Sequence, residues 1–326
     1  MTLLKVEDLS IKFKSRQGVV QAVGGLSFDI KQGHSLGIVG ESGSGKSVTS
    51  LAIMGLLQKA VTDITGKIQF EDVDLLTSSP EYMRKMRGKS VSMIFQEPMT
   101  SLNPLHTCGK QIMEPILIHQ KGIRKNEAEK TAIELLRMVG IPSPEQRFHE
   151  YPHQMSGGMR QRIMIAIALA CEPKLLIADE PTTALDVTIQ AQILDLMNRL
   201  IKKRDMSLIL ITHDLGVVKE MCDEIVVMYT GQIVEKSPTT AVFTQPLHPY
   251  TKGLLNAIPK ISRKVDRLEA IEGTVPDALN LPNGCSFHPR CQFATDRCKN
   301  EAPPLFLQED GREVRCFLYD KTKKEG

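Results

Sequence analysis

The feature that most constrains this chain of 326 residues is GESGSGKS at positions 40–47. It fits the pattern G-x-x-x-x-G-K-[ST], in which glycines let successive backbone N–H groups turn inward and surround a phosphate. The apolar run before it predicts a buried strand, and a helix is expected over 48–57 after it. A strand, this loop and a helix in succession predict a nucleotide-binding core of the α/β class.

The residues of this loop have separate expected roles. Lys46 would extend to the β- and γ-phosphates of ATP, and the Ser47 hydroxyl would hold Mg²⁺. The N-terminal end of the following helix would direct its partial positive charge at the anion. The expected nucleotide contacts of the loop are Gly40, Ser42, Gly43, Ser44, Gly45, Lys46, Ser47 and Val48.

Polar side chains are expected where three further apolar strands end. The strands are predicted over 90–96, 175–178 and 207–211, and the polar residues are Gln96, Asp179, Glu180 and His213. Ligands of open α/β sheets bind at the carboxyl ends of the strands. Gln96 and Asp179 would hold Mg²⁺. Glu180 would orient and polarise the attacking water, and His213 would hydrogen-bond the γ-phosphate. Without the phosphate loop, each of these residues would be read as structural.

The N-terminal part of the chain has the pattern of antiparallel strands. Residues 2–33 alternate apolar and polar side chains, with a turn expected at 16–18. These strands are expected beside the nucleotide strand. Phe13 would either stack on an adenine ring or belong to the core.

Strand patterns stop between residues 98 and 171, and an all-helical insertion is expected there. Helices are predicted over 109–120, 125–139 and 157–171, with Asn103, Pro104, Gly140, Pro142 and Pro144 marking the loops. Such an insertion in an α/β domain would present a surface to a partner.

A glycine pair stands at the start of the last of these helices, in MSGGM at 155–159. Ser156 would cap the helix, and Gly157 and Gly158 would expose N–H donors to an anion. The alternative is a simple turn. Asp186 is expected to cap the next helix, which would end near residue 204.

Composition limits the remaining classes. The chain is 41% apolar and 24% charged with a net charge of +3, which is typical of globular proteins. Its longest apolar run is about nine residues, short of the ~20 that span a bilayer. The N-terminus has no uninterrupted apolar segment, so no secretion signal is expected. The last third is nearly balanced in charge, which argues against nucleic-acid binding.

With these motifs in this order, the chain resembles the ATP-binding subunits of ABC transporters over residues 2 to about 258. The phosphate loop, Gln96 of the Q-loop, the signature MSGGM, the Walker B stretch LLIADE, the D-loop ALD and the switch His213 carry the resemblance. The commoner signature is LSGGQ, and Met155 and Met159 replace its ends here. SGGMRQR, HPYTKGLLNAIP and the cysteine tail look similar to the di- and oligopeptide uptake branch, including the D subunit of dipeptide permeases.

The resemblance implies a P-loop NTPase core, residues 1–258, with an antiparallel β-subdomain and a helical subdomain at about 98–171. It implies that two subunits close head to tail over two ATP molecules, so Ser156, Gly157 and Gly158 of one subunit cover the nucleotide of the other. Phe13 would be the adenine-stacking aromatic, and Asp186 an interface contact.

The resemblance also implies the partners. They are two transmembrane permease subunits, a related ATPase or a second copy of this chain, and indirectly an extracytoplasmic peptide-binding protein. The chain would lie at the cytoplasmic face of the cell membrane.

The segment 259–326 is expected to form a small Cys-rich domain. Its thiols Cys285, Cys291, Cys298 and Cys316 follow C-x5-C-x6-C-x17-C. Unliganded thiols, a zinc site and an iron–sulfur cluster are all compatible with this spacing, although zinc sites usually contain C-x2-C pairs. The resemblance to the peptide branch implies a [4Fe–4S] cluster.

The leading hypothesis is therefore an ATPase subunit that powers peptide import. Three alternatives stay open at this point. They are the same role in nickel import, a soluble ABC-type iron–sulfur ATPase acting on nucleic acid or ribosomes, and a metal-sensing regulator that binds ATP.

Overall fold

The computed structural model describes residues 1–16, 18–97, 101–183, 185–257 and 271–321. The chain folds into two compact units. The helical unit consists of Met1, Lys31–His34 and Thr77–Leu210, and the loop unit consists of Thr2–Ile30, Ser35–Leu76 and the described part of Ile211–Gly326.

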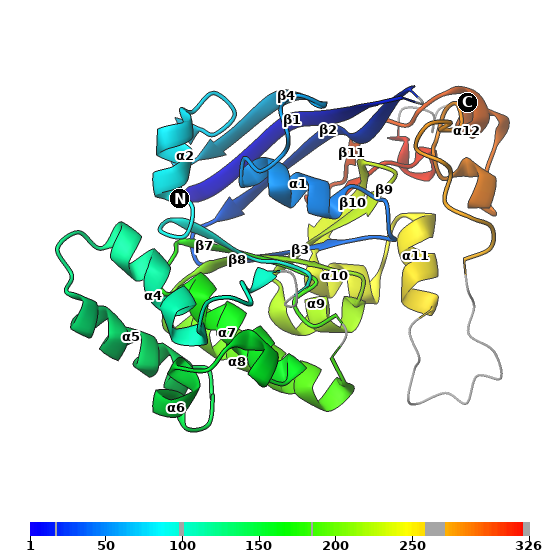
Figure 1. Cartoon of the computed structure of the whole chain (residues 1–326). Coiled ribbons are helices and arrows are strands. Elements are labelled where there is room, and N and C mark those ends of the chain that lie inside the picture. The colour runs from blue at the N-terminus through cyan, green and yellow to red at the C-terminus, as the bar shows by residue number, and fades with distance from the viewer. Residues whose placement is uncertain (17, 98–100, 184, 258–270, 322–326) are drawn as a thin grey trace. The chain divides into compact units, whose positions relative to one another are not determined.

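The loop unit contains a four-stranded antiparallel sheet in the order β2-β1-β4-β5 (Figure 1). Its strands are β1 (Thr2–Ser15), β2 (Gly18–Lys31), β4 (Thr62–Phe70) and β5 (Val73–Asp74). Leu4 of β1 lies opposite Phe70 of β4, and Val6 lies opposite Ile68. These four side chains are buried. The alternating N-terminal pattern is thus confirmed as antiparallel strands with one buried face.

The phosphate loop follows a strand of a second sheet in this unit. There β3 (Ser35–Val39) runs parallel to β9 (Glu224–Tyr229), and β9 pairs antiparallel with β10 (Gln232–Pro238). The C-terminal strands β11 (Phe306–Leu307) and β12 (Glu313–Val314) pair with each other, and β12 also pairs with β10, where Val314 lies opposite Glu235. The Cys-rich segment therefore adds strands to the sheet that holds the phosphate loop.

Helices of the loop unit are short. They are α1 (Lys46–Ile53), α9 (Leu215–Met221), α10 (Thr239–Thr244), α11 (Pro249–Asn256) and α12 (Asp296–Asn300), with single turns η2 (His288–Arg290) and η3 (Phe317–Tyr319). The predicted helix over 48–57 begins earlier than expected, at Lys46, because Gly45 serves as its N-cap in a left-handed conformation.

The helical unit is built on strands β6 (Val91–Ile94), β7 (Leu175–Asp179) and β8 (Ser207–Thr212), in the order β8-β7-β6. Its helices are α2 (Pro80–Met86), α4 (Cys108–His119), α5 (Lys125–Met138), α6 (Pro144–Phe148), α7 (Gly157–Leu169) and α8 (Val187–Lys203), with η1 (Pro152–Gln154). Helices α4, α5, α6 and α7 pack together (Figure 1).

The three helices predicted for the insertion are confirmed as α4, α5 and α7, with ends shifted by one or two positions. Helix α6 is not among the predicted helices, because Pro144 is predicted from the sequence to mark a loop. Proline is tolerated in the first turn of a helix, where its missing N–H has no intrahelical partner, and Pro144 occupies that place. The expected start of the insertion at 98 and the expected domain boundary at 258/259 lie on residues outside those described.

No helix in the described parts of the chain is long and apolar enough to cross a bilayer.

Candidate nucleotide-binding site

The phosphate loop has the backbone shape that its glycines require. Gly45 has φ +94°, and a Cβ there would lie 2.5 Å from the carbonyl oxygen of Ala22. A Cβ on Gly40 would lie 2.2 Å from the carbonyl oxygen of Met228. Both positions therefore exclude a side chain. By contrast, a Cβ on Gly43 would meet nothing within 4 Å, and Ser42 and Gly43 are exposed, so this side of the loop is open to a ligand.

Lys46 lies over the loop. Its side chain is buried, and Nζ donates hydrogen bonds to the carbonyl oxygens of Gly40 and Glu41 at 2.7 and 2.9 Å and to Ser44 Oγ at 3.3 Å. Ser47 and Val48 follow in the first turn of α1 and are half-buried. The ammonium group is thus held among the loop's own oxygens, where a phosphate would exchange for some of these partners.

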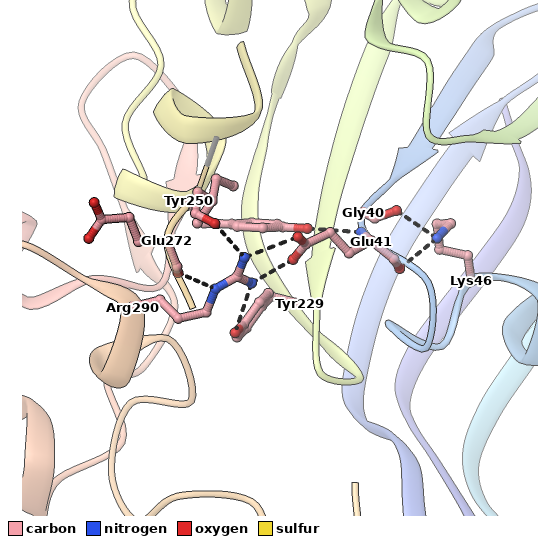
Figure 2. Close-up of polar contacts among 8 residues, drawn as sticks. Gly40, Glu41, Lys46, Tyr229, Tyr250, Glu272 and Arg290 are labelled. Atoms are coloured by element: carbon pink, nitrogen blue, oxygen red, sulfur yellow. Dashed lines mark hydrogen bonds and ion pairs between the residues drawn. The ribbon is translucent and has the colours of Figure 1, made fainter. Parts of the chain in front are cut away.

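The loop is also anchored by contacts that sequence reasoning missed. Glu41 accepts a bidentate ion pair from Arg290, and its N–H donates to the Tyr250 hydroxyl at 2.9 Å (Figure 2). Arg290 lies 249 positions from Glu41. No local pattern could have found this pair, because Glu41 occupies a position where the motif accepts any residue.

The predicted polar groups at the strand ends of the helical unit come together. Strands β6 and β7 are parallel, with Ile94 opposite Ala178, so their carboxyl ends share one edge. Gln96 Nε2 donates to Glu180 Oε2 at 3.0 Å.

Glu180 has a strained and well-held position. Thr183 Oγ1 donates to its Oε2 at 2.8 Å, and its φ is +45°, a left-handed value that costs a non-glycine residue about 1–3 kcal/mol. Strain of this kind clusters at functional sites. Asp179, one residue before it, is buried at the end of β7.

The signature residues lie at the exposed N-terminus of α7. Ser156 is the N-cap, as predicted, and its hydroxyl accepts from the Met159 N–H at 3.3 Å. Ser156 and Gly157 are exposed, so their polar groups are accessible. Met155 is buried and packs as an apolar core residue, which explains why methionine can replace leucine there.

Leu185 of the D-loop and helix α8 lie beside the signature, and a Cβ on Gly157 would lie 3.8 Å from Leu185. A Cβ on Gly158 would meet Ile189 of α8 at 2.9 Å, so glycine permits the close approach of the two helices. Asp186 caps α8, as predicted, and accepts from the Ile189 N–H at 2.9 Å.

The two remaining predicted contacts belong to the loop unit. Phe13 lies in β1 opposite Thr62 and is half-buried, so it is not a fully buried core residue. His213 follows β8 and is exposed, and Asp214 caps α9.

The four C-terminal thiols line one cavity of about 200 Å³. None of Cys285, Cys291, Cys298 and Cys316 is in a disulfide. Burial raises the pKa of the Cys285 and Cys291 thiols, and it raises that of Cys316 to about 11. The nearby backbone N–H groups of Phe287, Phe293 and Leu318 act against these shifts and lower the three pKa values.

These thiols do not converge on one point. In the described residues, no group of three or more His, Cys, Asp or Glu side chains is close enough to hold a single metal ion. The ligands of a cluster bind different iron atoms and need not converge in this way.

Comparison with known proteins identifies relatives along the whole chain. Residues 23–183 match the family described as "ABC transporter", and residues 234–298 match the one described as "Oligopeptide/dipeptide transporter, C-terminal region". The oligopeptide transport ATP-binding protein AppD of Bacillus subtilis (strain 168) is 55% identical over 325 residues, 99% of each chain. The dipeptide transport ATP-binding protein DppD of Escherichia coli (strain K12) is 52% identical, covering 97% of this chain and 96% of that one.

Solved structures share the fold over most of the chain. The ATP-binding cassette MJ0796, in a dimeric post-hydrolysis state bound to ADP and Pi, superimposes with a TM-score of 0.66 at 26% identity, covering 72% of this chain and 98% of that one. A second, cbiO1 from Clostridium perfringens, gives a TM-score of 0.62 at 28% identity, covering 75% of this chain and 91% of that one.

Proposed function

Because this chain belongs to the family of ATP-binding subunits of dipeptide and oligopeptide ABC transporters, we propose that it hydrolyses ATP to drive peptide import. The observation that carries the hydrolytic part is the pairing of Gln96 with Glu180 at the edge formed by β6 and β7. A carboxylate held at the end of a buried strand, in a chain with a phosphate loop, has the chemistry of a water-activating base.

The residues of the loop unit bind the nucleotide in this proposal. The N–H groups of residues 40–47 and the Lys46 ammonium hold the phosphates, Phe13 stacks on the adenine, and His213 hydrogen-bonds the γ-phosphate. Mg²⁺ would be held by hard oxygen ligands, which suit this cation, and the candidates are the Ser47 hydroxyl, the Asp179 carboxylate and the Gln96 amide oxygen. The bound cation would supply positive charge to neutralise the phosphates.

Glu180 acts on the attacking water. Its Oε2 accepts hydrogen bonds from Gln96 and Thr183, which fix the carboxylate at the end of β7, where it accepts a proton from the attacking water. Asp179, buried and one residue earlier, remains a cation ligand.

The signature acts on the nucleotide of another subunit. Ser156 and Gly157 are exposed at a helix N-terminus, a place that suits a phosphate from outside the chain. Two subunits arranged head to tail then close over two ATP molecules, with Asp186 and Gly158 at the interface. The second subunit is a related ATPase or another copy of this chain.

Two transmembrane permease subunits receive the motion through the helical unit and the Q-loop, which places this chain at the cytoplasmic face of the cell membrane. An extracytoplasmic binding protein delivers the peptide. The names of the relatives favour peptides over nickel and do not favour a role on nucleic acid or ribosomes.

Deletion of the gene, with uptake of labelled di- and tripeptides as the readout, tests this function. Loss of uptake that is restored by the wild-type chain and not by Lys46→Ala supports it. Normal peptide uptake by the deletion strain, or full restoration by Lys46→Ala, contradicts it.

For the C-terminal cavity, a [4Fe–4S] cluster is the proposed occupant. Four free thiols line one space of about 200 Å³ and come from different parts of the Cys-rich segment, as the ligands of a cluster do. The raised thiol pKa values mean that these sulfurs are protonated near neutral pH unless a metal replaces the protons.

Anaerobic purification, iron and sulfide analysis and absorption near roughly 400 nm test the cluster. About four irons per chain that are lost in Cys316→Ser support it. A colourless preparation with one zinc per chain, or with no metal, contradicts it.

A further inference from the structure

A buried arginine of the Cys-rich segment reaches the phosphate loop. The Arg290 side chain is 4% exposed, and its two terminal nitrogens bind the two carboxylate oxygens of Glu41, at 2.7 Å for Nη1 and 3.1 Å for Nη2 (Figure 2). Such a fork-to-fork pair is stronger and more directional than a single ion pair.

The guanidinium group is fixed from its other sides as well. Nε donates to the Glu272 carbonyl oxygen at 3.0 Å, Nη2 donates to that of Ile271 at 3.4 Å, and Nη1 donates to the Tyr229 hydroxyl at 3.4 Å. Its central carbon lies 5.9 Å from the centre of the Tyr229 ring. Arg290 therefore has one defined position from which to hold Glu41.

Glu41 connects Arg290 to the phosphate site. Its carbonyl oxygen accepts from Lys46 Nζ, and its N–H donates to the hydroxyl of Tyr250, which is fully buried. Tyr250 packs against Tyr229 and Phe287, with ring centroids 4.7 and 5.5 Å away. Both the backbone and the side chain of this loop residue are thus tied to segments beyond residue 228.

Charge gives the contact a second effect. Glu41 is the only acidic residue in GESGSGKS, and its carboxylate stands in a loop that must receive phosphates. A paired guanidinium cancels that negative charge and keeps the carboxylate turned toward the C-terminal segment.

We propose that Arg290 is a positioning residue for nucleotide binding: it neutralises the Glu41 carboxylate and keeps it turned toward the C-terminal segment, which makes ATP affinity depend on the Cys-rich segment. This inference rests on the proposed role of residues 40–47 as the ATP site. Arg290 lies in η2 between Cys285 and Cys291, and the His288 N–H bonds the Cys285 carbonyl at 2.9 Å while the Cys291 N–H bonds the His288 carbonyl at 3.2 Å. The turn that carries the arginine is therefore part of the wall of the four-thiol cavity.

The test compares Arg290→Met, Glu41→Gln and the double variant. Arg312 gives a matched control, because it is also buried and is ion-paired in this segment, to Asp310. Its described partners include no residue of the phosphate loop. The readout is the Kd of a fluorescent ATP analogue with Mg²⁺, with KM and kcat measured alongside.

We expect Arg290→Met to raise Kd and KM about tenfold, within the range typical of coupling between sites, with most of the loss in KM. Adding Glu41→Gln removes the unpaired carboxylate and should return Kd to within about threefold of wild type. Arg312→Met should bind as wild type does. If Arg290 only stabilised the local structure, adding Glu41→Gln would not restore ATP binding, because the double variant still lacks the ion pair.

Wild-type Kd in folded Arg290→Met, or failure of Glu41→Gln to rescue, overturns the inference. If Arg290→Met does not fold, Arg290→Gln, which also removes the positive charge, replaces it, and a wild-type Kd in that folded variant overturns the inference. Lys46→Ala distinguishes failure of the proposed ATP site from failure of the role of Arg290. Unchanged ATP binding by Lys46→Ala refutes the ATP site itself. Loss of ATP binding by Lys46→Ala together with wild-type binding by Arg290→Met refutes only the role of Arg290.

Discussion

Replacing Ser156 with aspartate should separate the stability of the chain from its activity. Ser156 caps α7 by accepting from the Met159 N–H at 3.3 Å. Aspartate is as good an N-cap as serine, and its charge interacts favourably with the helix dipole by about 0.3–1 kcal/mol. Ser156→Asp should therefore fold with equal or slightly higher stability.

The same charge should block hydrolysis. In the proposed head-to-tail pair, this position faces the γ-phosphate of an ATP bound by another subunit. A second negative charge about 5 Å from a phosphate, at an effective dielectric constant of about 20, costs about 3 kcal/mol. That energy corresponds to a loss of at least about 100-fold in ATPase rate or in ATP-dependent pairing.

A matched substitution exists on another helix. Ser79 is the N-cap of α2 and is exposed, and it accepts from the Tyr82 N–H at 3.2 Å. Ser79→Asp makes the same chemical change at the same kind of position, outside every predicted nucleotide contact. It should keep wild-type ATPase activity.

Steady-state ATPase rates at saturating Mg·ATP, ATP-dependent association by sedimentation and thermal unfolding measure the three properties. Ser156→Asp that unfolds like wild type but hydrolyses ATP within about threefold of the wild-type rate would refute the placement of the signature against a phosphate.

Three further predictions concern the loop and the segment after it. Lys46→Ala should weaken ATP binding by at least about tenfold, because a charge-assisted contact to phosphate is lost; unchanged affinity by equilibrium binding would count against the loop as the site. Gly45→Ala should both weaken ATP binding and lower the unfolding temperature, since its Cβ would lie 2.5 Å from the Ala22 carbonyl at φ +94°; wild-type values for both would show that the loop can adopt another shape. Burial lowers the pKa of His248 to about 3, so between about pH 6.5 and pH 3 the unfolded chain binds a proton that the folded chain does not. The free energy of unfolding should therefore fall by up to about 1.4 kcal/mol for each unit by which the pH is lowered across this range. His248→Gln should show a correspondingly shallower slope in urea denaturation, and equal slopes in the two proteins would contradict this assignment.

The parts of the site that follow local rules could be predicted from the sequence. The phosphate loop, the strand ends carrying Gln96 and Glu180, and the caps at Ser156 and Asp186 all depend on neighbouring residues and on the period of a strand or helix. The structure confirms their secondary structure and brings Gln96 into contact with Glu180. Helix α6 was missed because a proline read as a loop marker is also a good first residue of a helix.

The parts that depend on long-range contacts could not be predicted. The ion pair between Glu41 and Arg290 joins residues 249 positions apart, and nothing in either local sequence indicates it. The sequence predicts a small Cys-rich domain over 259–326 but does not predict that strands of this segment pair with earlier strands. Pairing of β12 with β10 ties it to the sheet of the loop unit, and two-residue strands of this kind leave too short a pattern to be recognised.

Hydrolysis by Glu180→Gln tests the central claim most directly. The substitution keeps the shape of the side chain and removes the base, so ATP should bind with a Kd within about threefold of wild type while single-turnover hydrolysis slows by roughly 10² to 10⁴. The measurement uses the chain together with its partner ATPase or, if it pairs with itself, the chain alone. In the Glu180→Gln variant, ATP should trap the pair of subunits in the closed form. Near-normal turnover by Glu180→Gln would remove the water-activating role from this residue and contradict the account.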